Sequence, residues 1–296
     1  MANKLQEYQQ LSADTAVRIT RSYLEWTGFL STISRIYKYP FSEQLLIYAQ
    51  RPEVTACAEY GFWNQTMRQY IRRGSTGIAL IDNSRGKPFL RYVFDVADTG
   101  GGENACRPYL WQYRAEHHDA VSSMLESRYG IANHDLAEQL EGVAAHIADE
   151  YWNNSQRDIL NIVDNSFLEG YDDFNIGAAF RNAVAVSVTY TVMSRCGLEP
   201  ENYFTLEEFQ SIFDFNTVDT VTAMGAAVSQ SSEQVLRQIE RTVKQYEREK
   251  EAERSTNNGK QPDLHTNGGL PDSPIWPCRS SRTGTWASTG GCACGT

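Results

Sequence analysis

The 296-residue sequence lacks any apolar run of about 18 residues, the length that a membrane-spanning helix requires. Its first residues, Met1 to Glu7, also lack the apolar core of a secretory signal peptide. Both absences argue against a membrane or exported protein. The sequence therefore predicts a soluble, cytoplasmic protein with no membrane partner.

Motifs for metals, cofactors and covalent catalysis are missing as well. Cys57, Cys106 and Cys196 are widely spaced and the other three cysteines fall in the last 19 residues, so no disulfide framework or Cys-x-x-Cys pair is present. The sequence has no Gly-Lys-Ser/Thr phosphate loop, no His-Glu-x-x-His helix and no Gly-x-Ser-x-Gly elbow. We predict no cofactor, no metal ion and no catalytic residue in this chain.

Charge is present in quantity, and it is unevenly distributed. The formal net charge is −10, but residues 1–115 hold 14 Lys and Arg against 10 Asp and Glu, whereas residues 116–272 hold 11 against 27. Between Tyr60 and Arg91 six cations face a single acid, Asp82. The first 115 residues also contain 18 of the 34 aromatic residues. Basic charge among aromatic rings suits single-stranded nucleic acid, although most large rings in a small domain pack in its core.

Hydrophobic spacing predicts three helices and a hairpin in the first part of the chain. The helices are expected over 13–36, 42–50 and 60–71, the second ending before Arg51-Pro52 because proline restricts the preceding residue. Two apolar runs, 78–81 and 89–94, flank a turn at Gly86 and predict an antiparallel hairpin. The glycine-rich segment 95–106 is expected to be a loop.

From residue 115 onward the spacing is almost wholly helical. The expected helices are 118–128, 134–152, 156–165, 175–196, 206–213 and 217–253. The fold class is therefore α+β, with a small N-terminal domain of helices and an antiparallel hairpin over 12–105, followed by an all-helical acidic domain over 116–253.

The C-terminal segment 254–296 has a different composition. It begins as a polar stretch, which we expect to be a disordered linker. Residues 273–296 then contain no Asp, Glu, Lys or Leu, but four Ser, four Gly, four Thr and three Cys. We interpret this tail as the product of a frameshift or truncation of the gene.

Several elements of the first domain, in order, resemble a known family. They are Glu59-Tyr60-Gly61-Phe62-Trp63, then Arg68, Ile71-Arg72-Arg73-Gly74, Gly77-Ile78 and Tyr92 to Thr99. This pattern resembles the N-terminal domain of the ArdC antirestriction proteins and is similar to the N-terminus of large helicase/methylase proteins of conjugative elements. The resemblance implies a domain that binds single-stranded DNA, with a helicase or relaxase of the same element as a further partner.

The basic residues around the predicted hairpin are the candidates for phosphate contact. They are Arg68, Arg72, Arg73, Lys87 and Arg91. We expect a basic turn at Arg72-Arg73-Gly74. Trp63 precedes this turn, where it serves either as a packing anchor or as a stacking platform for a base.

A shorter match lies in the acidic half. Residues 187–203 resemble the helix and turn that close the zinc-peptidase domain of ArdC-like proteins, but the histidine and glutamate ligands are missing. The resemblance thus implies a degenerate peptidase region without metal. We expect a non-catalytic module of a mobile-element protein, from a conjugative plasmid or transposon, that binds single-stranded DNA. The alternative is a protein-interaction or DNA-mimic antirestriction factor that acts through the acidic half.

Overall fold

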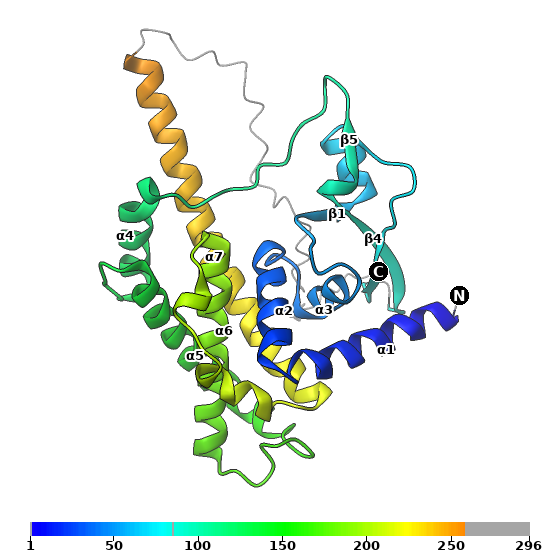
Figure 1. The fold of residues 1–296 in the computed structure, drawn as a ribbon, viewed down its shortest axis with the longest axis vertical. Helices are drawn as coiled ribbons and strands as arrows, with labels where there is room; N and C mark the ends of the chain where they lie inside the picture. The colour runs from blue at the N-terminus through cyan, green and yellow to red at the C-terminus, as the bar shows by residue number, and fades with distance from the viewer. Residues whose placement is uncertain (1, 85, 258–296) are drawn as a thin grey trace, which may run out of the picture.

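The computed structural model describes residues 2–84 and 86–257, and this part of the chain has the expected α+β class (Figure 1). It begins with the helices α1 (Ala2–Ile19), α2 (Tyr23–Arg35) and α3 (Phe41–Gln50). Small antiparallel sheets follow, and then the helices α4 (His118–Tyr129), α5 (Leu136–Leu160), α6 (Asp173–Cys196) and α7 (Val218–Asn257). No helix in the described residues is long and apolar enough to cross a membrane.

The predicted hairpin is confirmed. Strands β3 (Ile78–Asp82) and β4 (Phe89–Asp95) pair antiparallel, with Ile78 opposite Val93 and Asp82 opposite Phe89. Strand β1 (Cys57–Glu59) pairs with the other edge of β4, giving the order β1-β4-β3. The turn beside Gly86 suits that residue because its φ of 78° is a left-handed conformation.

A second small sheet was not expected. Strand β2 (Gln69–Ile71) pairs with β5 (Thr99–Gly101), where the sequence predicts a helix and a loop. Only a short π-helical turn, η1 (Phe62–Thr66), forms within the predicted helix 60–71. Both errors have one cause, because a three-residue strand becomes stable only through a partner about 30 positions away.

Helix boundaries also differ from the predictions. The expected helix 13–36 is broken between Ile19 and Tyr23, where the Ser22 hydroxyl caps α2 by accepting from the Glu25 amide at 3.3 Å. The two helices expected over 134–165 form one helix, α5. Helix α7 extends to Asn257, so the expected linker does not begin at 254. The remainder of the predicted tail lies outside the described residues.

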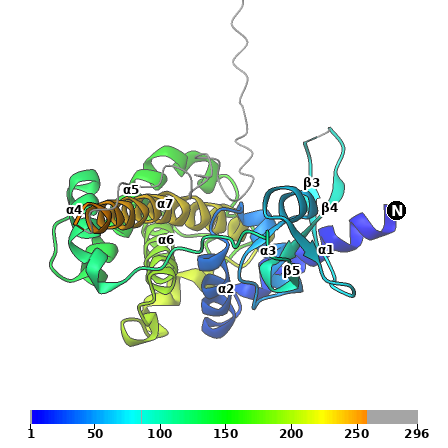
Figure 2. The ribbon, with the colours of Figure 1, turned by 90° about the horizontal axis from the view of Figure 1, so that it is seen from above.

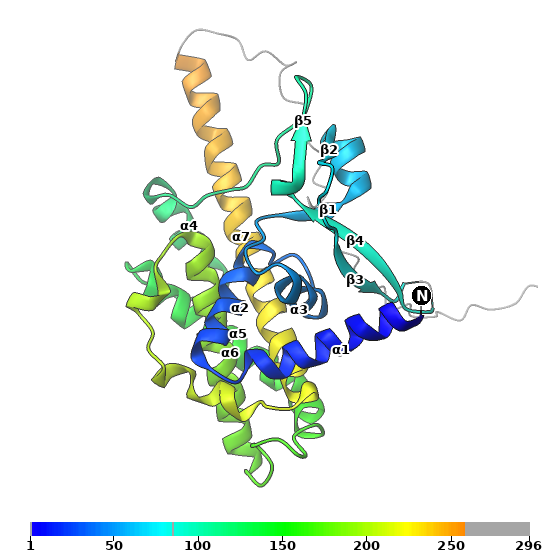
Figure 3. The same ribbon diagram turned by 45° about the vertical axis from the view of Figure 1, so that its right-hand side comes forward.

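Two hydrophobic cores meet at α3. Phe41 and Leu45 point into a large core with α2, α5, α6 and α7, whereas Leu46 and Ile47 point into a smaller core under the three-stranded sheet. Figures 2 and 3 show α2 and α3 between the long helices and the strands. The approach of α3 to α7 requires Gly225, since a Cβ there would lie 2.1 Å from the Phe41 ring.

The expected boundary between the two domains is therefore not a boundary between cores. Helix α2 belongs to the predicted N-terminal domain, but Trp26, Phe29 and Leu30 are fully buried in the large helical core. The Trp26 indole donates to the Ser187 hydroxyl of α6 at 2.9 Å. The first helices thus complete the helical region, and residues 12–105 do not bury their apolar surface by themselves.

Candidate nucleic-acid interface

The basic turn predicted from the sequence forms the loop between β2 and β3, residues 72–77. The Ser75 amide donates to the Arg72 carbonyl at 3.1 Å, and Gly74 has a φ of 90°, as the third residue of a type II turn requires. The Arg72 amide donates to the Asp98 carbonyl at 2.8 Å, which attaches the loop to the turn before β5. Two arginines are therefore held on a defined turn.

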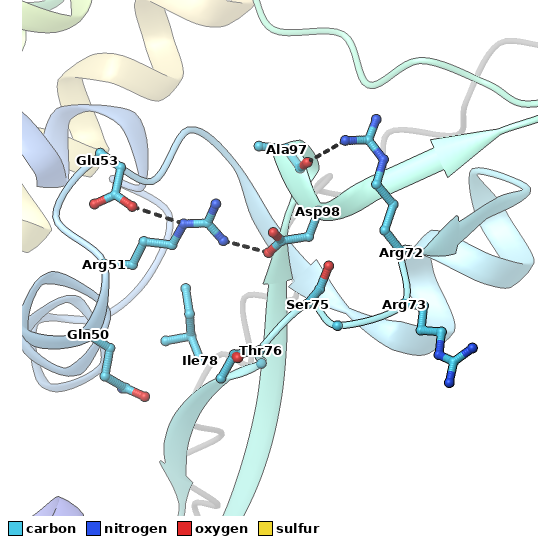
Figure 4. Close-up of a pocket in the computed structure, with 12 residues that line it drawn as sticks. Gln50, Arg51, Glu53, Arg72, Arg73, Ser75, Thr76, Ile78, Ala97 and Asp98 are labelled. Atoms are coloured by element: carbon cyan, nitrogen blue, oxygen red, sulfur yellow. Dashed lines mark hydrogen bonds and ion pairs between the residues drawn. The ribbon is translucent and has the colours of Figure 1, made fainter.

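This loop borders a shallow depression of about 750 Å³ (Figure 4). Its opposite wall is the end of α3, where the Gln50 side chain bonds both backbone groups of Ala79 at 2.9 Å and so satisfies the exposed edge of β3. Arg51 lies between Asp98 at 2.6 Å and Glu53 at 3.3 Å. The depression therefore has one neutralised cation on its α3 side.

Four of the predicted phosphate ligands are exposed and unpaired. Arg68, Arg72, Arg73 and Lys87 form no ion pair with any carboxylate in the described part of the chain. The Arg72 guanidinium makes one long hydrogen bond, 3.3 Å, to the Ala97 carbonyl, whereas Arg73 leaves the loop in another direction (Figure 4). Arg85, the remaining cation of the turn between β3 and β4, lies outside the described residues.

Backbone donors accompany these side chains. Among the residues that the structure describes, the amides of Arg73, Gly74 and Thr76 have no hydrogen-bond partner. Free amides that follow one another around a left-handed residue form a concave site that attracts anions. The loop thus carries unpaired backbone donors next to two exposed cations, Arg72 and Arg73.

Arg91 was predicted to contact phosphate, and the structure contradicts that role. Its side chain is only 14% exposed and lies among three carboxylates, Glu43 at 2.6 Å, Glu59 at 3.2 Å and Asp82 at 3.9 Å. Burial alone would lower the pKa of Arg91, but the carboxylates, Glu43 above all, raise it overall. Arg91 therefore links α3 to the sheet and is not available to a phosphate.

Trp63 was a candidate for base stacking, and its position contradicts that prediction too. The indole is fully buried in the smaller core and donates to the Phe94 carbonyl at 2.9 Å. Three tyrosines near the sheets, Tyr60, Tyr70 and Tyr92, are instead 56%, 58% and 41% exposed. Successive side chains of a strand point to opposite faces, which places Tyr70 of β2 and Tyr92 of β4 on an outer face. Tyr70 could have been found in this way only if β2 had been predicted as a strand.

The structure groups only part of the predicted site. Arg68, Arg72 and Arg73 flank the short strand β2, with Tyr70 between them. Lys87 lies at the other end of the hairpin, beyond Asp82 and Phe89, so the five paired residues of β3 separate it from the loop by roughly 15 Å. The candidate interface is thus centred on β2 and its loop.

The described residues hold no cluster of three or more His, Cys, Asp or Glu that could bind a metal ion. Helix α6, which carries most of the segment expected to resemble a peptidase, buries a mainly apolar face that also contains Ser187, Thr189 and Thr191. No family model, no curated protein and no solved structure matches this chain.

Proposed function

We propose that this chain is a non-catalytic module that binds single-stranded DNA through β2 and the loop 72–77. The observation that carries the proposal is the grouping of three unpaired arginines, Arg68, Arg72 and Arg73, with free backbone amides and the exposed ring of Tyr70. Cations and amides suit phosphates, and the ring suits an unstacked base.

The backbone of Arg68 supports this proposal. Its φ of 53° is left-handed, a conformation that costs an arginine roughly 1 kcal/mol and a glycine almost nothing. A long cationic side chain at such a position is more useful for a ligand than for the fold. The Arg68 residue is exposed, as is Tyr70 two positions later.

The biological setting follows from the resemblance to ArdC-like domains and is part of the same proposal. A conjugative plasmid or transposon produces single strands during transfer, and a binding module would hold them for a helicase or relaxase of the same element. A role of the acidic half in protein interaction is a second candidate, favoured by a separate surface that is described below.

The direct test is charge reversal at the loop. The full chain carrying Arg72→Glu and Arg73→Glu should bind a fluorescein-labelled oligo(dT) about 10- to 100-fold more weakly at about 50 mM salt. The slope of log affinity against log salt should fall by about 1.4, since each phosphate contact to a single strand contributes about 0.7. Fluorescence anisotropy over a salt series measures both quantities.

A matched control separates this site from the effect of net charge. Arg157→Glu with Arg248→Glu makes the same charge change at exposed positions of α5 and α7. An equal loss in both double variants, or no binding by the wild-type chain at tens of micromolar protein, would refute the proposal.

A further inference from the structure

Large apolar side chains face solvent at the turn that joins α5 to α6. Phe167 is 65% exposed, Tyr171 48% and Phe174 76%. Large apolar side chains that gather on an exposed surface mark a site of interaction.

Of these three rings, Tyr171 lines a groove of about 560 Å³ between α6 and the 3-10 helix η5 (Glu207–Asp214). Ala178 and Ala179 of α6 line it together with Tyr171. At the other side Asn182 of α6 donates to the Ser211 hydroxyl of η5 at 3.1 Å. Phe174 lies one helical turn before Ala178 and therefore on the same face of α6 as this lining residue. A volume of this size accommodates one or two large side chains of a partner.

The exposed rings are presented by a well-anchored turn. Leu168 is fully buried, and the Phe167 amide donates to the Asn216 side chain at 2.9 Å. At the start of α6 the Asp172 carboxylate caps the helix by accepting from the Asn175 amide at 2.7 Å. The rings therefore face solvent from a fixed backbone, which lowers the entropy cost of docking.

The segment that carries the groove is mainly acidic. Residues 161–217 contain nine Asp and Glu and only two Arg. Arg181 pairs with Asp149 at 3.3 Å, and Arg195 lies 3.9 Å over the Trp111 ring and donates to its carbonyl. Both cations are thus committed to other contacts.

Acidic side chains also lie in the groove itself. Asp214 is one of its lining residues, and burial raises the pKa of this carboxyl group. Asp172 and Asp173 stand at the start of α6, next to Tyr171 and Phe174. A ligand that brings positive charge here would relieve the cost of placing these carboxylates close to an apolar surface.

We propose that this surface, defined by Tyr171, Phe174, Ala178 and Asp214, docks a Lys/Arg-rich segment of a partner protein that carries a large apolar anchor. The anchor fills the groove over Ala178 between the rings, and the basic side chains meet Asp172, Asp173 and Asp214. Nucleic acid and anionic membranes are disfavoured occupants because the groove would repel their phosphates. This site is separate from the loop 72–77 and does not depend on the proposed DNA binding.

The test uses random 12-residue peptides displayed on phage and selected on the full chain. Binders are then compared on the double variant Phe174→Ser with Asp214→Asn and on a control, Leu24→Ser with Asp158→Asn. The control removes a 77% exposed leucine of α2 and an exposed aspartate of α5, so both variants lose one apolar group and one charge at the surface.

Selected peptides should have net positive charge and an aromatic or aliphatic anchor, and they should bind the groove variant at least about 10-fold more weakly than the control. Oligo(dT) binding should be the same in both variants, which separates this result from the proposed DNA function. Enrichment of neutral or acidic peptides, equal binding to both variants, or no enrichment would each overturn the proposal.

Discussion

Two regions of the molecule differ in whether their cations have carboxylate partners. Where α7 meets the chain after α2, Lys38 is buried and pairs with Glu240 at 2.7 Å, and the Tyr37 hydroxyl donates to the same carboxylate at 2.7 Å. In the loop 72–77, Arg72 and Arg73 have no carboxylate partner among the described residues. We refer to these regions as the closed junction and the open loop.

This difference means that the net charge of a segment does not identify which of its cations can bind a ligand. The closed junction satisfies its groups internally, since the Trp111 indole donates to the Tyr37 hydroxyl at 3.0 Å and Lys244 donates to Glu240 at 2.8 Å. Removing a partner there should cost stability. Removing a cation from the open loop should cost affinity and leave stability almost unchanged.

The largest effect is expected at the closed junction. Glu240→Gln should lower the free energy of unfolding by about 3 kcal/mol at neutral pH, because it leaves the Lys38 ammonium buried without its counter-ion. Urea unfolding followed by circular dichroism measures this loss. Affinity for oligo(dT) should not change in the folded variant, and a large change in affinity would contradict the separation of the two regions.

The stability difference between wild type and Glu240→Gln should also depend on pH. Burial would raise the pKa of Glu240, but Lys38 and hydrogen bonds from Lys244, Lys38 and Tyr37 outweigh it and bring the pKa to about 2. A lowered pKa stabilises the fold above the ordinary value of 4.5 and loses that contribution as the pH falls through 2. The stability advantage of wild type over Glu240→Gln should therefore shrink between about pH 4.5 and pH 2. An advantage that stays constant over this range would contradict the assignment.

Arg91 gives a second test of the difference between paired and unpaired cations. It lies in the basic segment of the sequence, but in the structure it is part of a closed ion-pair cluster. Arg91→Ala should cost about 2 kcal/mol of stability, since Glu43 would remain partly buried without its cation. Arg72→Ala is the matched control and should cost less than about 0.5 kcal/mol. Thermal or urea unfolding of both variants compares the two arginines directly.

The pKa of Glu43 is raised whereas that of Glu240 is lowered, yet both variants should lose more stability as the pH rises, each over its own pH range. Burial already raises the pKa of Glu43, and the loss of Arg91 should raise it further. A carboxyl group with a raised pKa destabilises the folded state as the pH rises through that value, so the deficit of Arg91→Ala should grow from about pH 4 to pH 7. A deficit that shrinks with rising pH would show that Arg91 does not neutralise Glu43.

The smallest changes in stability are expected at Trp63 and Tyr70, which should differ in role: Trp63 packs in the core and Tyr70 stacks on a base. Trp63→Phe should cost about 1 to 1.5 kcal/mol through the lost hydrogen bond to the Phe94 carbonyl, with oligo(dT) affinity unchanged. Tyr70→Ala should leave stability nearly unchanged and weaken oligo(dT) binding by about 1 to 3 kcal/mol, the contribution of one stacked base. The opposite pattern would return Trp63 to the interface.

Local signals were sufficient for much of the fold. The apolar runs 78–81 and 89–94 predicted the hairpin because a two-residue period and a glycine turn are properties of neighbouring residues. Helix α6 was predicted to within two residues of its start, and Gly197 ends it in the αL conformation. The strand pair β2–β5 was missed because two strands about 30 positions apart stabilise each other.

The candidate site was only partly predictable for the same reason. The sequence identified the cations of the segment 60–91, and three of them, Arg68, Arg72 and Arg73, flank one exposed strand. It could not show that Arg91 is neutralised by Glu43, 48 positions away, or that Trp63 donates to a carbonyl 31 positions away. The acidic groove was also invisible, since α6 and η5 meet only after folding.

The sequence by itself determined the α+β class, the positive and negative halves, and the turn that carries Arg72 and Arg73, because propensity and charge are local properties. Tertiary structure decided that the first helices complete the helical core, that Trp63 and Arg91 serve the fold, and that Tyr70 is left open. The physical reason is that burial and charge pairing depend on segments distant in the chain, such as Trp26 and Ser187, 161 positions apart.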